Sequence, residues 1–159
     1  MKSSEEAIIG TGGNGHSGSG ATPTGSRASF LHLVTGREVE ELREALDRGK
    51  PPADLEAKLF RLRSESLLSR FVQQNSRLIM DVLLAAYHGA FREASPATLE
   101  RLLRVLAYVR KEADAVPDYL PGGLVDDQRE IRAVIAEFRQ LFDSFKAWRL
   151  RFQVPGMWV

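Results

Sequence analysis

The sequence contains no cysteine, which excludes disulfide bonds, thiolate nucleophiles and cysteine-based zinc sites. Histidine is scarce, and His16, His32 and His88 are too scattered along the chain to indicate a metal site. Zinc-protease and serine-hydrolase motifs are also absent. We therefore predict a protein that is not an enzyme and that needs no cofactor.

An excess of charge of either sign is lacking as well. The 22 Lys and Arg residues nearly balance the 21 Asp and Glu residues, which leaves a formal net charge of +1. No strong overall field therefore draws the chain toward nucleic acid. No recognised nucleic-acid-binding module is present either, so we predict no nucleic-acid partner.

Long hydrophobic runs are missing. The most apolar stretch, residues 78–91, is interrupted by Asp81 and His88, whereas a spanning helix needs about 20 apolar residues. The first residues include an apolar run of only three, and a secretory signal needs roughly 7–15. We predict a cytoplasmic protein, and peripheral attachment to a membrane is left open.

Residues 1–29 hold seven of the thirteen glycines together with many Ser and Thr residues. Such a segment buries too little apolar surface to offset the entropy of ordering it. It is predicted to be a flexible, low-complexity tail. Residues 10–15 match the letters of a dinucleotide-binding motif, but no helix can follow them, and the motif requires one.

The rest of the chain, residues 30–159, is predicted to be a single helical domain. No segment alternates apolar and polar residues as a half-buried strand requires. Apolar residues instead recur at steps of three and four. This spacing, with the start signals Thr35, Ser95 and Asp127, predicts an all-α fold, a compact bundle of about five helices over residues 35–49, 53–74, 77–91, 95–113 and 127–154.

The sequence also predicts where the second helix ends and where the last helix begins. Asn75 and Ser76 are expected to end or cap the second helix. Asp127 and Glu130 have the spacing of a capping box, so Asp127 is expected to cap the last helix. The apolar periodicity from Ile131 to Phe152 then predicts one continuous helix of about six turns.

A proline-rich corner, residues 114–127, joins the last two predicted helices. It holds two of the seven prolines and four of the eight aspartates. The prolines fix their own φ angles, and the glycines permit a sharp turn. The residues of this candidate functional loop are Asp114, Pro117, Asp118, Pro121, Gly123, Asp126 and Asp127.

The corner resembles the signature of the YkvA-like bacterial domain of unknown function. The matching residues are Asp114, Pro117, Asp118, Leu120, Pro121, Gly123, Asp126 and Asp127. The resemblance covers roughly residues 80–145, and one departure is Glu112, where many members have proline. It implies a small helical domain without an established reaction, and it supplies no catalytic residues.

Two interpretations of the four aspartates follow from their chemistry. They cap helices, brace the corner and pair with Arg110, Arg129 or Arg132, as aspartates in turns usually do. Alternatively, Asp114, Asp118, Asp126 and Asp127 converge on a divalent cation, which prefers oxygen ligands. The first interpretation predicts a structural corner; the second predicts a cation-binding protein or a hydrolase-type enzyme.

The C-terminal end is the candidate partner surface. Basic residues outnumber acidic ones along the last predicted helix, and aromatic residues gather at its end. A basic amphipathic end with tryptophan suits a membrane interface, and a solvated face of a packed helix is the alternative. We predict a non-catalytic interaction or scaffold module that binds another protein or a membrane, with a homo-oligomer left open, through Arg149, Arg151, Phe152 and Trp158.

Overall fold

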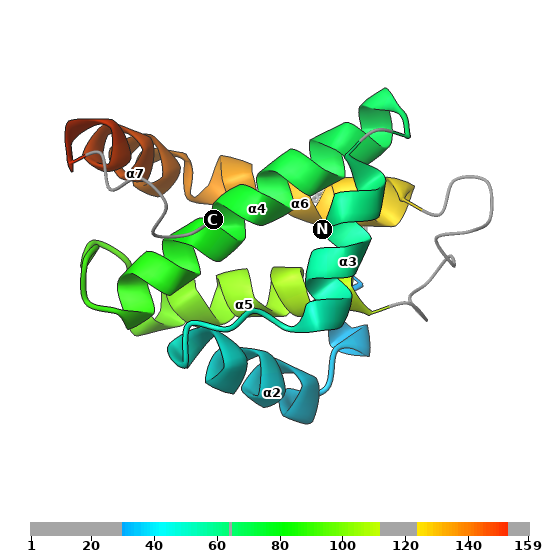
Figure 1. The fold of residues 1–159 in the computed structure, drawn as a ribbon, viewed down its shortest axis with the longest axis horizontal. Coiled ribbons are helices and arrows are strands. Elements are labelled where there is room, and N and C mark those ends of the chain that lie inside the picture. Colours follow the sequence, from blue (N-terminus) through cyan, green and yellow to red (C-terminus); the bar gives the residue numbers. More distant parts are fainter. Residues whose placement is uncertain (1–29, 64, 112–123, 153–159) are drawn as a thin grey trace, which may run out of the picture.

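The computed structural model describes residues 30–63, 65–111 and 124–152, and this part of the chain is an all-α bundle (Figure 1). The predicted fold class is therefore confirmed. The predicted N-terminal tail lies outside the described residues. The described elements are the 3₁₀ turn η2 (Leu31–Leu33) and the helices α2 (Gly36–Asp47), α3 (Ala53–Leu62), α4 (Leu67–Tyr87), α5 (Pro96–Arg110), α6 (Val125–Glu137) and α7 (Arg139–Phe152).

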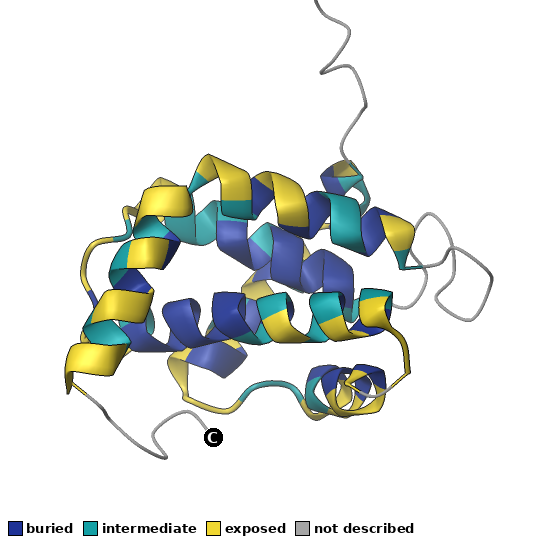
Figure 2. Cartoon of the chain, turned by 90° about the horizontal axis from the view of Figure 1, so that it is seen from above, coloured by how far each residue is buried: buried dark blue, intermediate teal, exposed yellow. Residues whose placement is uncertain are grey.

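Helices α4 and α5 form the centre of the bundle (Figure 1). Every residue from 78 to 85 in α4 is buried, and so is every residue from 105 to 109 in α5. A helix that is apolar on most sides must lie among other helices. The other helices cover this pair, so that buried residues line the interior and exposed residues lie on the outside (Figure 2). The most apolar stretch of the sequence, residues 78–91, therefore begins with a segment at the centre of the bundle.

Two predicted start signals are present in the structure. The Thr35 hydroxyl accepts a hydrogen bond from the Glu38 amide at 3.1 Å, and the Glu38 carboxylate accepts one from the Thr35 amide at 2.8 Å. Ser95 caps α5 by accepting from the Thr98 amide at 3.1 Å, with Pro96 in the first turn. These contacts satisfy amide groups that have no partner inside a helix.

The predicted break at Asn75 and Ser76 is wrong, because α4 continues through both residues. The Asn75 side chain donates to the Phe71 carbonyl oxygen at 2.9 Å, one turn back in the same helix, and Ser76 is buried against the core. The chain turns earlier, between Leu62 and Leu67. Ser66 provides the start signal there, since it and Ser69 form a reciprocal cap.

The prediction of a single long C-terminal helix is also wrong. Phe138 has φ −115° and ψ 38°, which lies outside the helical region, and it separates α6 from α7. The two helices therefore follow different directions (Figure 2). The apolar side chains on both sides of Phe138 pack against the core, so the periodicity continues across the bend.

The predicted cap at Asp127 is wrong as well. The cap position of helix α6 is Leu124, three residues before Asp127, and no side chain caps the helix. Asp126 and Asp127 lie in its first turn and are buried. Glu130 is not part of a capping box, because its carboxylate accepts a hydrogen bond from the Phe30 amide at 2.9 Å.

Candidate functional site

Four buried polar side chains lie where α5 ends and α6 begins. They are Lys58, Tyr108, Asp126 and Asp127, which we call the Lys58 cluster. They come from α3, α5 and the first turn of α6. Removing charged groups from water is costly unless each meets an opposite charge or a hydrogen bond, so the contacts within the cluster determine whether it is stable.

Lys58 connects three helices through one ammonium group. Its Nζ donates to the carbonyl oxygen of Val109, in the last turn of α5. The same Nζ lies 3.8 Å from Asp127 Oδ2. A cation is favoured at a helix C-terminus and a carboxylate at a helix N-terminus. Lys58 therefore lies between the negative end of α5 and the carboxylate at the start of α6.

Tyr108 and Asp126 form the second contact between α5 and α6. The Tyr108 hydroxyl donates to Asp126 Oδ2, and both side chains are buried. Phe30 stacks on the Tyr108 ring with the centroids 6.3 Å apart. The Arg129 guanidinium lies 4.5 Å from the centroid of the Phe30 ring. Phe30, the first of the described residues, therefore packs between Tyr108 of the cluster and Arg129.

Replacing Tyr108 by phenylalanine tests the hydrogen bond to Asp126. The ring and its packing stay, but the buried Oδ2 loses its donor, and a buried acceptor without its partner costs about 1–3 kcal/mol. We expect the free energy of unfolding, measured by urea denaturation, to fall by that amount. A Tyr87→Phe variant is a suitable control, because Tyr87 is only half-buried, and an equal loss in both variants would contradict this role.

The rest of the predicted loop lies outside the described residues, namely Asp114, Pro117, Asp118, Pro121 and Gly123. Of the two described aspartates, Asp126 accepts a hydrogen bond from Tyr108, and Asp127 lies beside Lys58. Arg110 instead pairs with Asp54 at 3.0 Å. The Arg132 guanidinium lies over the Phe71 ring, 4.7 Å from its centroid.

The cation interpretation depends on residues from both parts of the corner. Within the described ranges, no three His, Asp or Glu side chains come together as metal ligands. An ammonium group already lies beside Asp127. A cation held by all four aspartates would require Asp114 and Asp118, so that interpretation stays a prediction.

Sequence reasoning missed Lys58 and Tyr108. A signal for Lys58 exists, because it lies on the same side of α3 as the buried Leu55, Leu59 and Leu62. A charged residue within an apolar stripe indicates a buried ion pair. Tyr108 offers no comparable signal, since an aromatic residue among apolar neighbours is typical of an ordinary core.

The candidate partner surface lies on α7, which is anchored by aromatic packing. Phe145 is buried and meets Phe91 edge to face at 5.2 Å between ring centroids. Trp148 lies 5.6 Å from Phe91 and 5.8 Å from Phe152 by the same measure. The inner side of α7 is thus fixed to the loop that follows α4.

An ion pair adds a second anchor for α7. Arg149 Nη1 lies 2.7 Å from Asp81 Oδ2, and the side chains are 42% and 9% exposed, respectively. Burial raises the pKa of Asp81, and Arg149 opposes that shift. The cost of removing this carboxylate from water is therefore larger than the gain from its partner.

The end of α7 remains open to solvent. Leu150 is 74% exposed and Phe152 is 57% exposed. Lys146 and Arg151 are exposed beside them, and the Arg151 guanidinium lies 5.4 Å from the centroid of the Phe152 ring. Trp158, the last residue of the predicted surface, lies outside the described residues.

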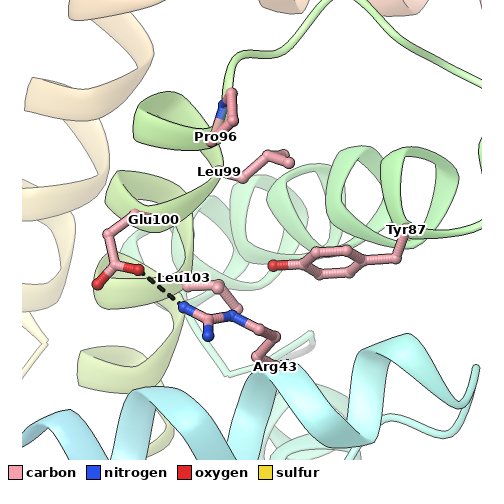
Figure 3. Close-up of a pocket in the computed structure, with 6 residues that line it drawn as sticks. All are labelled: Arg43, Tyr87, Pro96, Leu99, Glu100 and Leu103. Carbon is pink, nitrogen blue, oxygen red and sulfur yellow. Dashed lines mark hydrogen bonds and ion pairs between the residues drawn. The ribbon is translucent and has the colours of Figure 1, made fainter.

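A separate pocket of about 250 Å³ lies between α2, α4 and α5 (Figure 3). Apolar side chains and the ring of Tyr87 line it, and Arg43 lies at its edge. Arg43 already pairs with Glu40 at 2.5 Å and with Glu100 at 2.9 Å. Its charge is therefore neutralised, and the pocket offers no guanidinium for an anionic ligand. The lining residues are Arg43, Tyr87, Pro96, Leu99, Glu100 and Leu103.

Comparison with known protein families, curated proteins and solved structures finds no match to this chain. The resemblance to the YkvA-like domain therefore stays a prediction. None of the helices in the described ranges is long and apolar enough to cross a membrane.

Proposed function

We propose that this protein is a non-catalytic, YkvA-like interaction module of the cytoplasm that binds anionic membrane surfaces through the end of α7. We call residues 146–152 the α7 tip. The observation that carries the proposal is the exposure of Leu150 and Phe152 within this basic segment. Large exposed apolar side chains often mark an interaction site.

Charge favours an anionic membrane over a neutral one as the partner. The α7 tip contains Lys146, Arg149 and Arg151 and no acidic residue, and because Arg149 is paired with Asp81, Lys146 and Arg151 supply the charge for a partner. Apolar side chains at a membrane interface contribute by burial, and each basic residue near an anionic surface adds about 1 kcal/mol. The sequence after the tip adds Val154, Met157, Trp158 and Val159, whose composition suits the same interface.

Glutamine substitutions at Leu150 and Phe152 test the apolar part of the proposal. Glutamine is a good helix former, so the L150Q/F152Q variant keeps α7 while it removes two exposed apolar side chains. We expect it to bind vesicles of mixed phosphatidylserine and phosphatidylcholine at least about tenfold more weakly than the wild type. Co-sedimentation measures this, and circular dichroism checks that the fold is kept.

Two double variants test the contribution of the basic residues of the α7 tip to membrane binding. K146Q/R151Q removes two basic residues from the tip, and R37Q/R48Q removes two exposed basic residues of α2 and its C-cap. We expect the first to weaken binding and to reduce its salt dependence, and the second to bind like the wild type. Equal losses in both would show that only total charge matters, which would contradict a specific surface on α7.

A further inference from the structure

The turn between α3 and α4 carries a second basic and apolar surface. Residues 60–63 and 65–70, which we call the α3–α4 corner, contain three arginines and one glutamate. Phe60 is 64% exposed and Leu67 is 80% exposed, and the Arg63 guanidinium lies 4.1 Å from the centroid of the Phe60 ring. Arg61 and Arg70 are exposed at either end of the corner.

This exposure is not needed by the fold. Helix α3 buries Leu55, Leu59 and Leu62, so Phe60 lies on its outer side. Leu67 is the first residue of α4, where Ser66 and Ser69 already satisfy the start of the helix. The corner would be more soluble with polar residues at both positions. Like the α7 tip, it combines exposed apolar bulk with an excess of arginine over acidic residues.

The corner and α7 lie on the same side of the bundle. In Figure 1 both are at the upper edge, the corner at the right and α7 at the left, while α2 lies at the lower edge. The view from above shows exposed residues at both ends (Figure 2). A flat surface resting on this side would meet the corner and the α7 tip together.

We propose that the α3–α4 corner is a second contact site for the anionic membrane surface, so that the bundle rests on the membrane at two points. This inference relies on the proposed function of the α7 tip. Charge complementarity carries it, because arginines surround exposed apolar side chains at both points, and such surfaces suit anionic lipid headgroups above an apolar layer. The two sites belong to one folded bundle, so contact at one raises the effective concentration of the other.

Two corner variants test the inference in the full-length protein. F60Q/L67Q removes the apolar bulk, and R61Q/R70Q removes two arginines. We expect each to weaken co-sedimentation with phosphatidylserine-containing vesicles about tenfold. The R37Q/R48Q variant is the matched control for charge, since its two arginines lie on the α2 side of the bundle (Figure 1), and we expect it to bind like the wild type.

The outcomes separate this inference from the proposed function. If both corner variants bind like the wild type while L150Q/F152Q does not, the α7 tip acts alone and the inference is overturned. If the wild type binds neither vesicle type, the proposed function fails, and the inference fails with it. Losses in both corner variants and in the tip variants, with circular dichroism unchanged, support contact at two points.

Discussion

Replacing Lys58 by methionine is expected to lower the free energy of unfolding by about 3–5 kcal/mol. Methionine keeps the volume and the apolar stem but removes the ammonium group. The Asp127 carboxylate then stays buried without that charge, and the Val109 carbonyl oxygen at the end of α5 loses its donor. Both effects act at the point where α3, α5 and α6 meet. Urea denaturation followed by circular dichroism measures the loss.

A variant of a second lysine tests whether the loss of stability depends on the burial of the ion pair. Lys111 also pairs with a carboxylate, Glu38, at 2.8 Å, but the two side chains are 21% and 35% exposed. We expect Lys111→Met to cost less than about 1 kcal/mol, as more exposed pairs usually do. The double variant K58M/D127N should recover part of the K58M loss, because it removes the buried negative charge together with the ammonium group that faces it. A K58M variant as stable as K111M would contradict the anchoring role of Lys58.

Replacing Arg149 by methionine is expected to cost about 2 kcal/mol at neutral pH. The cost is smaller than for Lys58 because Arg149 is partly exposed, but Asp81 is almost fully buried. Asp81→Asn should cost much less, since burial already raises the pKa of Asp81 and penalises its charged form. The R149M/D81N double variant should therefore be more stable than R149M alone. A cost of R149M no larger than that of R101M, which removes a more exposed pair with Glu137, would contradict this interpretation.

The same ion pair predicts a pH dependence. Burial raises the pKa of Asp81 above its ordinary value of 3.8, Arg149 and Arg77 oppose the shift, and Glu56 adds to it. Removing Arg149 raises that pKa further. A carboxyl whose folded pKa is raised contributes stability that is complete below its unfolded pKa and is lost as the pH rises through its folded pKa. The deficit of R149M relative to the wild type should thus be small near pH 4 and grow toward neutral pH. A deficit that is constant with pH would contradict the role of Asp81.

Local signals predicted the fold class and several helix starts. The Thr35 and Ser95 caps depend on side chains that contact amides three residues away, and such contacts are readable from spacing. The bend at Phe138 is not readable in this way, because the apolar spacing continues across it. Apolar side chains are buried on both sides of the bend, Ile131 and Val134 in α6 and Phe142 and Phe145 in α7.

For the candidate sites too, the sequence predicted local features but not contacts between distant residues. The sequence predicted that Asp126 and Asp127 matter, but it placed Asp127 at a helix cap and offered arginines or a divalent cation as partners of the aspartates. Their contacts come from Lys58 and Tyr108, residues far away in the chain, and only the packing of α3 and α5 against α6 brings them together. The α7 tip was predicted from charge and aromatic residues alone. The α3–α4 corner was missed, because the predicted helix ran through it and placed Leu67 on its apolar stripe.

Binding of the intact protein to vesicles tests the central claim most directly. Co-sedimentation is measured with vesicles of phosphatidylcholine alone and with increasing shares of phosphatidylserine, each at low and high salt. We predict that the bound fraction rises with phosphatidylserine and falls with salt, because basic residues surround the exposed apolar side chains of the α7 tip. The same small bound fraction on every vesicle type, unchanged by salt, would contradict an anionic membrane as the partner.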